Sequence, residues 1–379
     1  MKPFAIYFPQ FYPTPTNDAA WGHGFTDWAL VANANMRGLW ARRAPRRGYY
    51  DGSSRAVHLS QIQEMRSFGL GGLALYHYCF YTHQELNAFE NTLLASDASQ
   101  VQPWFLVWAC EGWSRRWLGD PATVVSLTAK PSDDEIERHC DRLAACFSHE
   151  AYVRFNGRPL FVWYHLDHFA SPADVVDRYR RALGRRGFDV LMGHFVKNPF
   201  DAQHGATVDF SYLFEPRLFF GMRRVGRGSR AKQAYEVFKR VAGDRLAQKT
   251  LMLLDRFQQR GLTYDAQDYL RYLDSSERRQ FVSAIGGEVQ EVLSPGWNNA
   301  PRYGERFTAL ADVPAAAFGE LLRAPSRSDL PLLINAWNEW SEGAAIEPCA
   351  YLGTRYLDAL GSAPDGAPLP FDAQAIEAL

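Results

Sequence analysis

Short apolar runs recur along the chain, and polar or aromatic residues follow most of them directly. Apolar runs of this length, bounded by turn-forming residues, are typical of buried strands. They predict eight strands, at residues 4–7, 72–80, 104–108, 159–164, 190–192, 210–214, 288–293 and from 330 onwards. The last run ends in a cluster of carboxylates, an amide and indoles, where we expect the chain to leave the core.

Between the predicted strands, apolar residues recur at the three- to four-residue spacing of amphipathic helices. Helices are predicted at about residues 57–67, 133–147, 173–183 and 314–322. Alternating strands and helices with eight strands fit an α/β fold of the (β/α)8 barrel type. A doubly wound open sheet is the alternative. However, no GxGxxG follows the first strand and no GxxxxGK(S/T) occurs, so the nucleotide-binding motifs of that sheet are missing.

The chain is interpreted as a single barrel domain over residues 1–360. From about residue 217 to 280 the pattern becomes basic and helical with no clear strand, which predicts a helical insertion within that domain. Residues 361–379, which begin Gly-Ser-Ala-Pro-Asp-Gly, are predicted to form a loosely ordered C-terminal tail.

Two carboxylates, Glu339 and Glu342, follow the last predicted strand beside the indoles of Trp337 and Trp340. Active sites of parallel α/β folds are assembled at strand C-termini, so both carboxylates are expected at the mouth of a cleft. Such a pair suits glycosidic-bond chemistry, because one acid serves the leaving oxygen and aromatic faces pack against sugar C–H groups. The alternative is that the pair caps a helix or forms ion pairs with arginines.

The third predicted strand also ends in polar and aromatic residues. Glu111 lies between Trp108 and Trp113, and Arg115 and Arg116 follow. The carboxylate is predicted to bind sugar hydroxyls, and the arginines to hold an anionic group or to orient the carboxylates. The alternative, which does not exclude the first, is an ion pair between Glu111 and one of the arginines.

The loop Trp297-Asn298-Asn299 follows the seventh predicted strand and a Pro-Gly pair. It could present an aromatic platform and two amides to a sugar, or it could be a turn capped by asparagine. Side chains near the other strand ends complete the set of candidate substrate-binding residues. That set comprises Gln10, Trp28, Tyr76, His77, Trp108, Glu111, Trp113, Arg115, Arg116, Tyr164, Glu215, Trp297, Asn298, Asn338 and Trp340.

The chain's 379 residues carry 41 Lys and Arg against 42 Asp and Glu, a net charge of −1. This balance gives no sign of a nucleic-acid partner or of an anionic membrane surface. Aromatic residues make up 14% of the chain and 11 of them are Trp, which favours a flat ligand such as a sugar. The expected partner is therefore an oligosaccharide or polysaccharide, and the sequence indicates no oligomeric state.

The five cysteines are widely spread and form no CxxC pair, a pattern typical neither of a disulfide framework nor of a zinc site. His77, His165 and His194 fall near predicted strand ends but lack HxH or HExxH spacing, so no metal and no other cofactor are expected. The N-terminus lacks a signal-peptide pattern and no run of 18 apolar residues occurs. We therefore expect no membrane span and a cytoplasmic location.

Five motifs occur in a fixed order along residues 4–358: YFPQF at 7–11, WGHGFTDW at 21–28, WACEGWSRRW at 108–117, PGWNN at 295–299 and WNEWSEG at 337–343. Together they resemble the WbsX-type proteins, which are found with bacterial surface-polysaccharide synthesis and are often labelled glycosyltransferases. Those proteins are similar in turn to glycoside hydrolase family 99, the endo-acting mannosidases with a (β/α)8 barrel. The ordered set is far more specific than any single motif.

The resemblance implies roles for the two carboxylates. It makes Glu339 the base that acts on the sugar 2-hydroxyl and Glu342 the general acid, in a reaction that retains configuration through the 2-hydroxyl. The sequence departs from the family pattern at several positions, with Ser341 in place of a His and Asn298 in place of an Asp. Asp27 likewise replaces a Glu, and Cys110 and Gly112 replace two Asn, so the identity of the sugar does not follow.

The sequence thus predicts an enzyme that cleaves glycosidic bonds of a bacterial surface polysaccharide or its precursor, with hydrolysis as the first choice. One alternative is glycosyl transfer in the biosynthesis of O-antigen, lipopolysaccharide or another surface polysaccharide. The other is a sugar-binding barrel without catalytic activity.

Overall fold

The computed structural model describes residues 2–36, 43–114, 123–224, 261–326 and 328–361. Arg115, Arg116, most of the predicted helical insertion and nearly all of the predicted tail lie outside these residues. No helix of the described ranges is long and apolar enough to cross a membrane.

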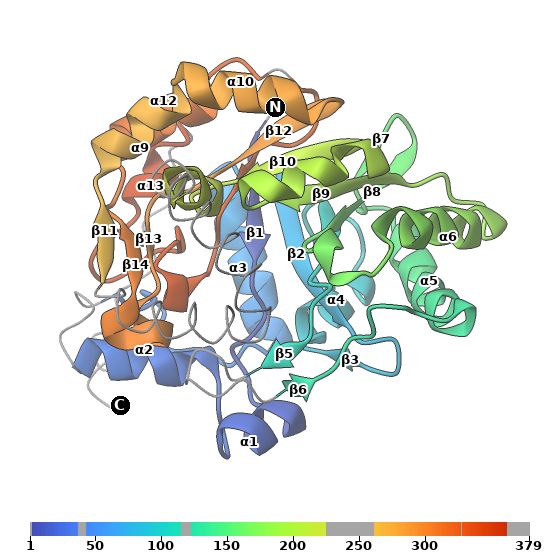
Figure 1. Cartoon of the computed structure of the whole chain (residues 1–379). Coiled ribbons are helices and arrows are strands. Elements are labelled where there is room, and N and C mark those ends of the chain that lie inside the picture. The colour runs from blue at the N-terminus through green and yellow to red at the C-terminus, as the bar shows by residue number, and fades with distance from the viewer. Residues whose placement is uncertain (1, 37–42, 115–122, 225–260, 327, 362–379) are drawn as a thin grey trace, which may run out of the picture.

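Eight parallel strands close into a barrel, as the sequence predicts (Figure 1). Each strand pairs with the next along the chain, and the last pairs with the first, so the sheet has no free edge. The apolar runs explain this arrangement, because the strands of a closed barrel are buried on both faces. In order they are β1 (Phe4–Tyr7), β2 (Gly72–Cys79), β4 (Trp104–Trp108), β8 (Arg158–Trp163), β9 (Leu191–Val196), β10 (Phe210–Phe214), β12 (Glu288–Leu293) and β15 (Leu333–Ile334).

Helices surround the barrel, with α5 and α6 side by side on one flank and α9, α10 and α12 on another (Figure 1). A 3-10 helix, η3 (Pro199–Thr207), stands between β9 and β10 where a regular barrel has an α-helix. Among the described residues, the α-helices of the outer layer are α3 (Arg55–Ser67), α4 (Ala88–Leu94), α5 (Asp133–Phe147), α6 (Pro172–Arg185), α9 (Ala266–Leu273), α10 (Ser276–Ile285), α12 (Ala315–Arg323) and α13 (Arg355–Asp358).

Helix α5 shows how the sequence sets this layer. Ser132 accepts a hydrogen bond from the Glu135 backbone, and the Glu135 side chain bonds back to the Ser132 backbone, so the first turn is capped. Ile136, Cys140 and Leu143 repeat at helical spacing and are buried against the barrel. The spacing therefore decides both the helix and the face that it buries.

Short elements beyond the barrel strands build the rim of the site. The loop after β1 holds α1 (Pro15–Trp21) and α2 (Asp27–Met36), and η5 (Trp340–Glu342) follows β15. A three-stranded sheet joins β11 (Leu262–Tyr264), β14 (Thr308–Leu310) and β13 (Trp297–Asn298). Strand β11 lies in the region predicted to have no strand, because three residues are too few to show an alternating pattern. The remaining short elements are β3 (Gln84–Glu85), β5 (Trp113–Ser114), β6 (Thr123–Val125), β7 (Arg154–Phe155), η2 (Leu166–His168), α11 (Ala300–Tyr303) and η4 (Gly304–Arg306).

Candidate active site

A cavity of about 980 Å³ opens at the C-terminal end of the barrel. Its walls come from residues at or just after the ends of the strands, as the barrel fold leads one to expect. The lining includes Phe8 after β1, Tyr76 and Tyr78 on β2, Glu111 after β4, Tyr164 and His165 after β8, Lys197 after β9, Phe214 and Arg217 at β10, Trp297 after β12, and Glu339 and Glu342 after β15. The cavity thus gathers side chains from all eight strands.

The segment after β15 is held in place by Asn338, whose side chain forms hydrogen bonds with both backbone groups of Phe8, as a neighbouring strand would. Its Oδ1 accepts a hydrogen bond from Phe8 N at 2.8 Å and its Nδ2 donates to Phe8 O at 2.8 Å. Trp337 N donates to Ile6 O at 2.7 Å, and the Trp340 indole donates to the buried Glu347 at 2.9 Å. These bonds tie the motif to β1, so the two carboxylates that flank Trp340 project into the cavity from a rigid base.

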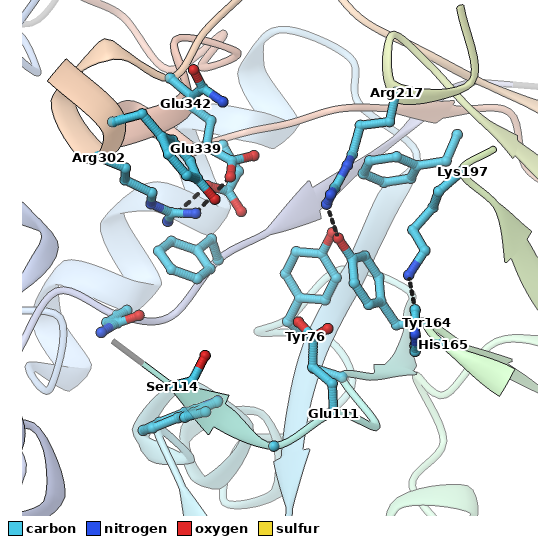
Figure 2. A pocket seen from close by; sticks show the side chains of 18 of the residues that line it. Tyr76, Glu111, Ser114, Tyr164, His165, Lys197, Arg217, Arg302, Glu339 and Glu342 are labelled. Atoms are coloured by element: carbon cyan, nitrogen blue, oxygen red, sulfur yellow. Dashed lines mark hydrogen bonds and ion pairs between the residues drawn. The ribbon is translucent and has the colours of Figure 1, made fainter. Parts of the chain in front are cut away.

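Arg302, on α11, lies beside Glu339 and Glu342 (Figure 2) and also contacts Asp27. Its Nη1 is 2.6 Å from Glu342 Oε1, and its Nη2 is 3.2 Å from Asp27 Oδ2 and 3.7 Å from Glu339 Oε2. Asp27 also accepts a hydrogen bond from the Ser341 hydroxyl. One guanidinium therefore neutralises only part of the negative charge that three carboxylates would carry, and its shortest contact is with Glu342.

The surroundings of Glu339 favour its protonated form. The residue is 6% exposed, and burial, with Glu342 as the second cause, raises the pKa of its carboxyl well above the usual value. Within the described residues, Glu339 Oε2 has no hydrogen-bond partner. The carboxyl of Glu339 is thus positioned to hold a proton and to face a ligand in the cavity.

Aromatic rings form much of the remaining wall. Trp113 is half-buried, and its ring meets Tyr78 at 5.5 Å and Phe80 at 5.4 Å in edge-to-face contacts. Trp297 and Phe8 also line the cavity, and the Phe8 ring lies 5.5 Å from the Arg302 guanidinium. Flat faces of this kind suit the C–H faces of a sugar ring.

Eight of the residues predicted from the sequence come together in the cavity lining. They are Gln10, Tyr76, Glu111, Trp113, Tyr164, Trp297, Glu339 and Glu342. Seven others lie outside the lining: Trp28, His77, Trp108, Glu215, Asn298, Asn338 and Trp340. Arg115 and Arg116 lie outside the described residues.

Strand alternation explains two of the seven. Successive side chains of a strand point to opposite faces, so Tyr76 and Tyr78 reach the cavity while His77 faces the helices. Trp108, at the end of β4, is fully buried beside Trp163 and donates its indole N–H to Cys79 O at 3.0 Å. Both side chains therefore pack between the barrel and its outer layer rather than in the site.

Glu215 and Asn298 have local structural partners instead. Glu215 is fully buried, ion-paired with Arg278 at 3.3 Å, and accepts a hydrogen bond from Phe219 N at 3.0 Å. Asn298, at the end of β13, accepts a hydrogen bond from Ala300 N, the first residue of α11, at 3.0 Å. Its neighbour Asn299 lines the cavity in its place.

Trp28, Asn338 and Trp340 form a layer beneath the lining. The Trp28 indole donates to Tyr50 O at 2.8 Å, and its ring stacks on Tyr49 at 5.0 Å. The Trp28 and Trp340 rings lie 6.3 Å apart. These side chains support the residues that line the cavity. A residue can therefore stand next to a lining residue in a sequence motif without reaching the cavity itself.

Sequence reasoning missed Arg302, Lys197 and Arg217, which line the cavity. No spacing rule points to an arginine on the four-residue helix α11. Tyr78 was also missed, although alternation from Tyr76 gives a signal for it.

Among the residues that the structure describes, one group of side chains could hold a metal ion, and it lies between β2 and α5. Atoms of His77, Cys79 and His139 lie within 4.8 Å of one another, and all three residues are buried. The same atoms form a hydrogen-bonded chain. His77 Nδ1 is 2.6 Å from Glu90 and Nε2 is 3.0 Å from His139, whose Nδ1 is 2.7 Å from Tyr179 OH. Burial opposes protonation of His77, but Glu90 raises its pKa to about 9. A protonated His77 that donates to Glu90 and to His139 therefore explains these hydrogen bonds without a metal ion.

Comparison with known families and proteins gives matches along nearly the whole chain. The family model described as Glycosyltransferase WbsX matches residues 3–360. A protein named WxcX and described as uncharacterized, from two strains of Xanthomonas campestris pv. campestris, is 28% identical over 382 residues. The match covers 96% of this chain and 50% of WxcX, so the chain spans about half the length of the curated relatives it matches.

Solved structures with the same architecture include a glycoside hydrolase-like protein, with a TM-score of 0.54 at 13% identity over 97% of this chain and 95% of that protein. The GH99 endo-alpha-mannosidase from Bacteroides thetaiotaomicron, in complex with BIS-TRIS-Propane, has a TM-score of 0.55 at 14% identity over 95% of this chain and 94% of its own. At such identities the similarity shows the shared barrel fold.

Proposed function

The chain belongs to the Glycosyltransferase WbsX family, and we propose that within this family it is a carbohydrate-active enzyme that breaks glycosidic bonds with Glu339 and Glu342 as its proton-transferring pair. The observation that carries this proposal is the position of the pair. Both carboxylates line a 980 Å³ cavity at the C-terminal end of the barrel, next to Arg302 and to aromatic faces.

The charges of the free site support a division of roles. Glu339, whose pKa is raised by burial and by Glu342, would hold the proton and act as the acid toward the glycosidic oxygen. Glu342, which makes the shortest contact with Arg302 at 2.6 Å, would act as the base. This assignment reverses the roles that the sequence resemblance implies.

The reaction then balances within the pair. Glu339 gives its proton to the leaving oxygen as the carbon–oxygen bond breaks, and Glu342 accepts a proton from a hydroxyl that becomes the new nucleophile. That hydroxyl is either the sugar's own 2-hydroxyl or the hydroxyl of an incoming acceptor. Arg302 compensates the charge on whichever carboxylate is ionised, which lets the pair exchange roles in a second step.

Water as acceptor gives hydrolysis, and a saccharide hydroxyl as acceptor gives transfer. We propose hydrolysis first, because the carboxylate pair matches the equipment of a glycosidase. The family's description favours transfer as the second candidate. For both, the proposed substrate is a bacterial surface polysaccharide or its precursor, as the resemblance to the WbsX-type proteins implies.

A product survey tests the proposal. The protein is incubated with fluorogenic glycosides and with oligosaccharides from bacterial surface polysaccharides, and products are read by mass spectrometry. Shortened saccharides indicate hydrolysis, and lengthened ones indicate transfer. The double variant Glu339→Gln/Glu342→Gln should form neither, whereas Glu320→Gln, an exposed glutamate of α12, should behave as the unmodified chain. Saccharides that bind but are never altered would identify a binding barrel instead.

Trp113 should contribute to saccharide binding as an aromatic platform. Replacing it with Ala is expected to weaken binding by about 1–2 kcal/mol, the cost of losing one well-packed ring contact. Saccharide titration followed by tryptophan fluorescence or calorimetry measures the change. Trp28→Phe, beneath the lining, should have a much smaller effect on affinity, and equal losses in both variants would argue against a platform at Trp113.

Chelation of metal ions should leave saccharide binding and turnover unchanged. The proposed reaction uses Glu339 and Glu342 beside Arg302, and the group formed by His77, Cys79 and His139 lies outside the cavity lining. Activity is compared before and after exhaustive dialysis against a chelator. Loss of activity that only an added divalent cation restores would contradict a mechanism based on the carboxylates alone.

A further inference from the structure

A second charged group lines the cavity on the side away from Glu339 and Glu342. Lys197, after β9, and Arg217, after β10, project into the same space (Figure 2). Lys197 is 7% exposed and its Nζ lies 2.6 Å from His165 Nδ1 and 3.8 Å from the centre of the Tyr164 ring. Arg217 Nη1 donates to Tyr164 OH at 2.8 Å. Within the described part of the chain, neither cation forms an ion pair with a carboxylate.

These side chains leave many hydrogen-bond donors unused. An ammonium has three donors, of which Lys197 uses one on His165, and a guanidinium has five, of which Arg217 uses one on Tyr164. Burial, and then Lys197, lowers the pKa of His165 to about 4, so its imidazole is neutral. Because its Nδ1 accepts from Lys197, its Nε2 carries the hydrogen and adds one more donor.

The carboxylates near these cations do not touch them. Glu111 and Asp201 oppose the lowering of the Lys197 pKa, and Glu342 and Glu111 raise that of Arg217, but in the described part of the chain none of the three carboxylates lies within ion-pair distance of either cation. Arg224 also lines the cavity and adds positive charge. A buried ammonium is costly to keep without an anion, and burial lowers the pKa of Lys197 to about 8. The wall is therefore rich in donors and short of acceptors.

We propose that Lys197, Arg217 and His165 Nε2 form a subsite for an anionic group carried by the saccharide, either the carboxylate of a uronic acid or the phosphate of a phosphorylated sugar. The inference rests on the proposed function, since it names the substrate class of the same cavity. Carboxylates and phosphates accept several charge-assisted hydrogen bonds at once, which is what this arrangement of donors offers. A neutral sugar would leave most of these donors without a charged acceptor.

The subsite lies close to the reacting bond. The charges of Glu339 and Glu342 both raise the pKa of Tyr164, and that of Glu342 raises the pKa of Arg217, so these groups lie near one another in the cavity. Tyr164 connects Arg217 with Lys197, since its hydroxyl accepts a hydrogen bond from Arg217 while its ring lies against the Lys197 ammonium. The anionic group would therefore belong to the sugar at the reacting bond or to its direct neighbour.

Binding of matched small ligands tests the inference on the full chain. Glucuronic and galacturonic acid, glucose 1-phosphate and galactose 1-phosphate are compared with neutral glucose and galactose by titration calorimetry or saturation-transfer NMR. At least one anionic class should bind about tenfold or more tightly than its neutral counterpart, because charge-assisted hydrogen bonds are gained. Preference for the uronic acids identifies a carboxylate, and preference for the sugar phosphates identifies a phosphate. Equal affinity for charged and neutral sugars would overturn the inference.

Two variants locate the binding. Lys197→Met keeps the length of the side chain, and Arg217→Gln keeps a polar group in the cavity; each should remove most of the preference for the charged ligand. Lys130→Met and Arg181→Gln, exposed positions away from the lining, should retain it. Thermal unfolding of each variant confirms that it is folded. If Lys197→Met unfolds, Arg217→Gln decides the result by itself, and an unchanged preference there would overturn the subsite.

The same measurements separate this inference from the proposed function. Neutral saccharides that bind in the cavity and are cleaved or transferred, without any preference for anions, would leave the function standing and remove the subsite. Failure of every saccharide, charged or neutral, to bind or react would instead remove the function on which the subsite rests.

Discussion

Replacing either Glu339 or Glu342 with Gln should lower turnover by about 10²–10⁴-fold, the usual contribution of one group that transfers a proton in the transition state. The amide keeps the shape of the carboxyl but can neither give nor take a proton at that position. Saccharide binding should change little, since both side chains remain in the lining. Single-turnover rates and saccharide affinity, measured on the same preparations, separate the two effects.

The leaving group tells which carboxyl is the acid. A substrate with a good leaving group needs little protonation, so it should restore the rate of the variant that lacks the acid far more than that of the other. From the charges of the free site, we expect Glu339→Gln to be rescued. Rescue of Glu342→Gln instead would support the roles implied by the family resemblance and would mean that bound substrate moves the proton. Full activity in both variants would show that the pair is structural.

The fold was predictable because its strands are continuous apolar runs. Residues 4–7, 104–108, 210–214 and 288–293 were predicted at the observed bounds, since burial on both faces leaves a plain signal in the sequence. The short strand β11 and the 3-10 helix η3 left no such signal. The three residues of β11 are too few to show a period. The 3-10 helix η3 stands between β9 and β10, where a regular (β/α)8 barrel would have an α-helix.

The site was predictable only in part. Glu111 and Glu339, which directly follow barrel strands or their loops, do line the cavity, because the end of a strand determines where the chain leaves the barrel. The direction of a side chain is a finer property: His77 and Trp108 stand at strand ends but face the helices. Periodicity carries that information for β2, where Tyr76 and Tyr78 share one face.

Residues that act through charge were hardest to find. Lys197 and Arg302 come from loops or short helices far apart in the sequence, and only the closed barrel brings them to one cavity. Nothing in a linear pattern separates Arg302 from the other arginines, whereas three carboxylates around one guanidinium are evident in space.

Replacing Arg302 with Met should lower turnover by about 10²–10³-fold, the usual cost of losing one group that stabilises charge in the transition state, and should change the dependence of turnover on pH. The guanidinium lowers the pKa of Glu339 against the effects of burial and of Glu342, so its loss should raise that pKa further. In a pH–rate profile, the limb at which Glu339 loses its proton should move to higher pH. Arg302→Lys keeps a positive charge and should leave that limb nearer its original position, although it loses the two-pronged geometry.

The same substitution should destabilise the fold by about 2 kcal/mol near neutral pH, because partly buried carboxylates lose their counter-charge. The direction in which stability changes with pH follows from the pKa of the Glu339 carboxyl. A pKa raised further in the folded state means that the folded chain binds more protons than the unfolded chain, so stability falls as pH rises above the unfolded value of about 4.5. Denaturant unfolding at about pH 5 and pH 8 should therefore show a larger deficit at the higher pH. Arg279→Gln, which removes an exposed pair with Asp274, should show almost none, and a deficit for Arg302→Met that shrinks with rising pH would contradict the charge balance proposed for the site.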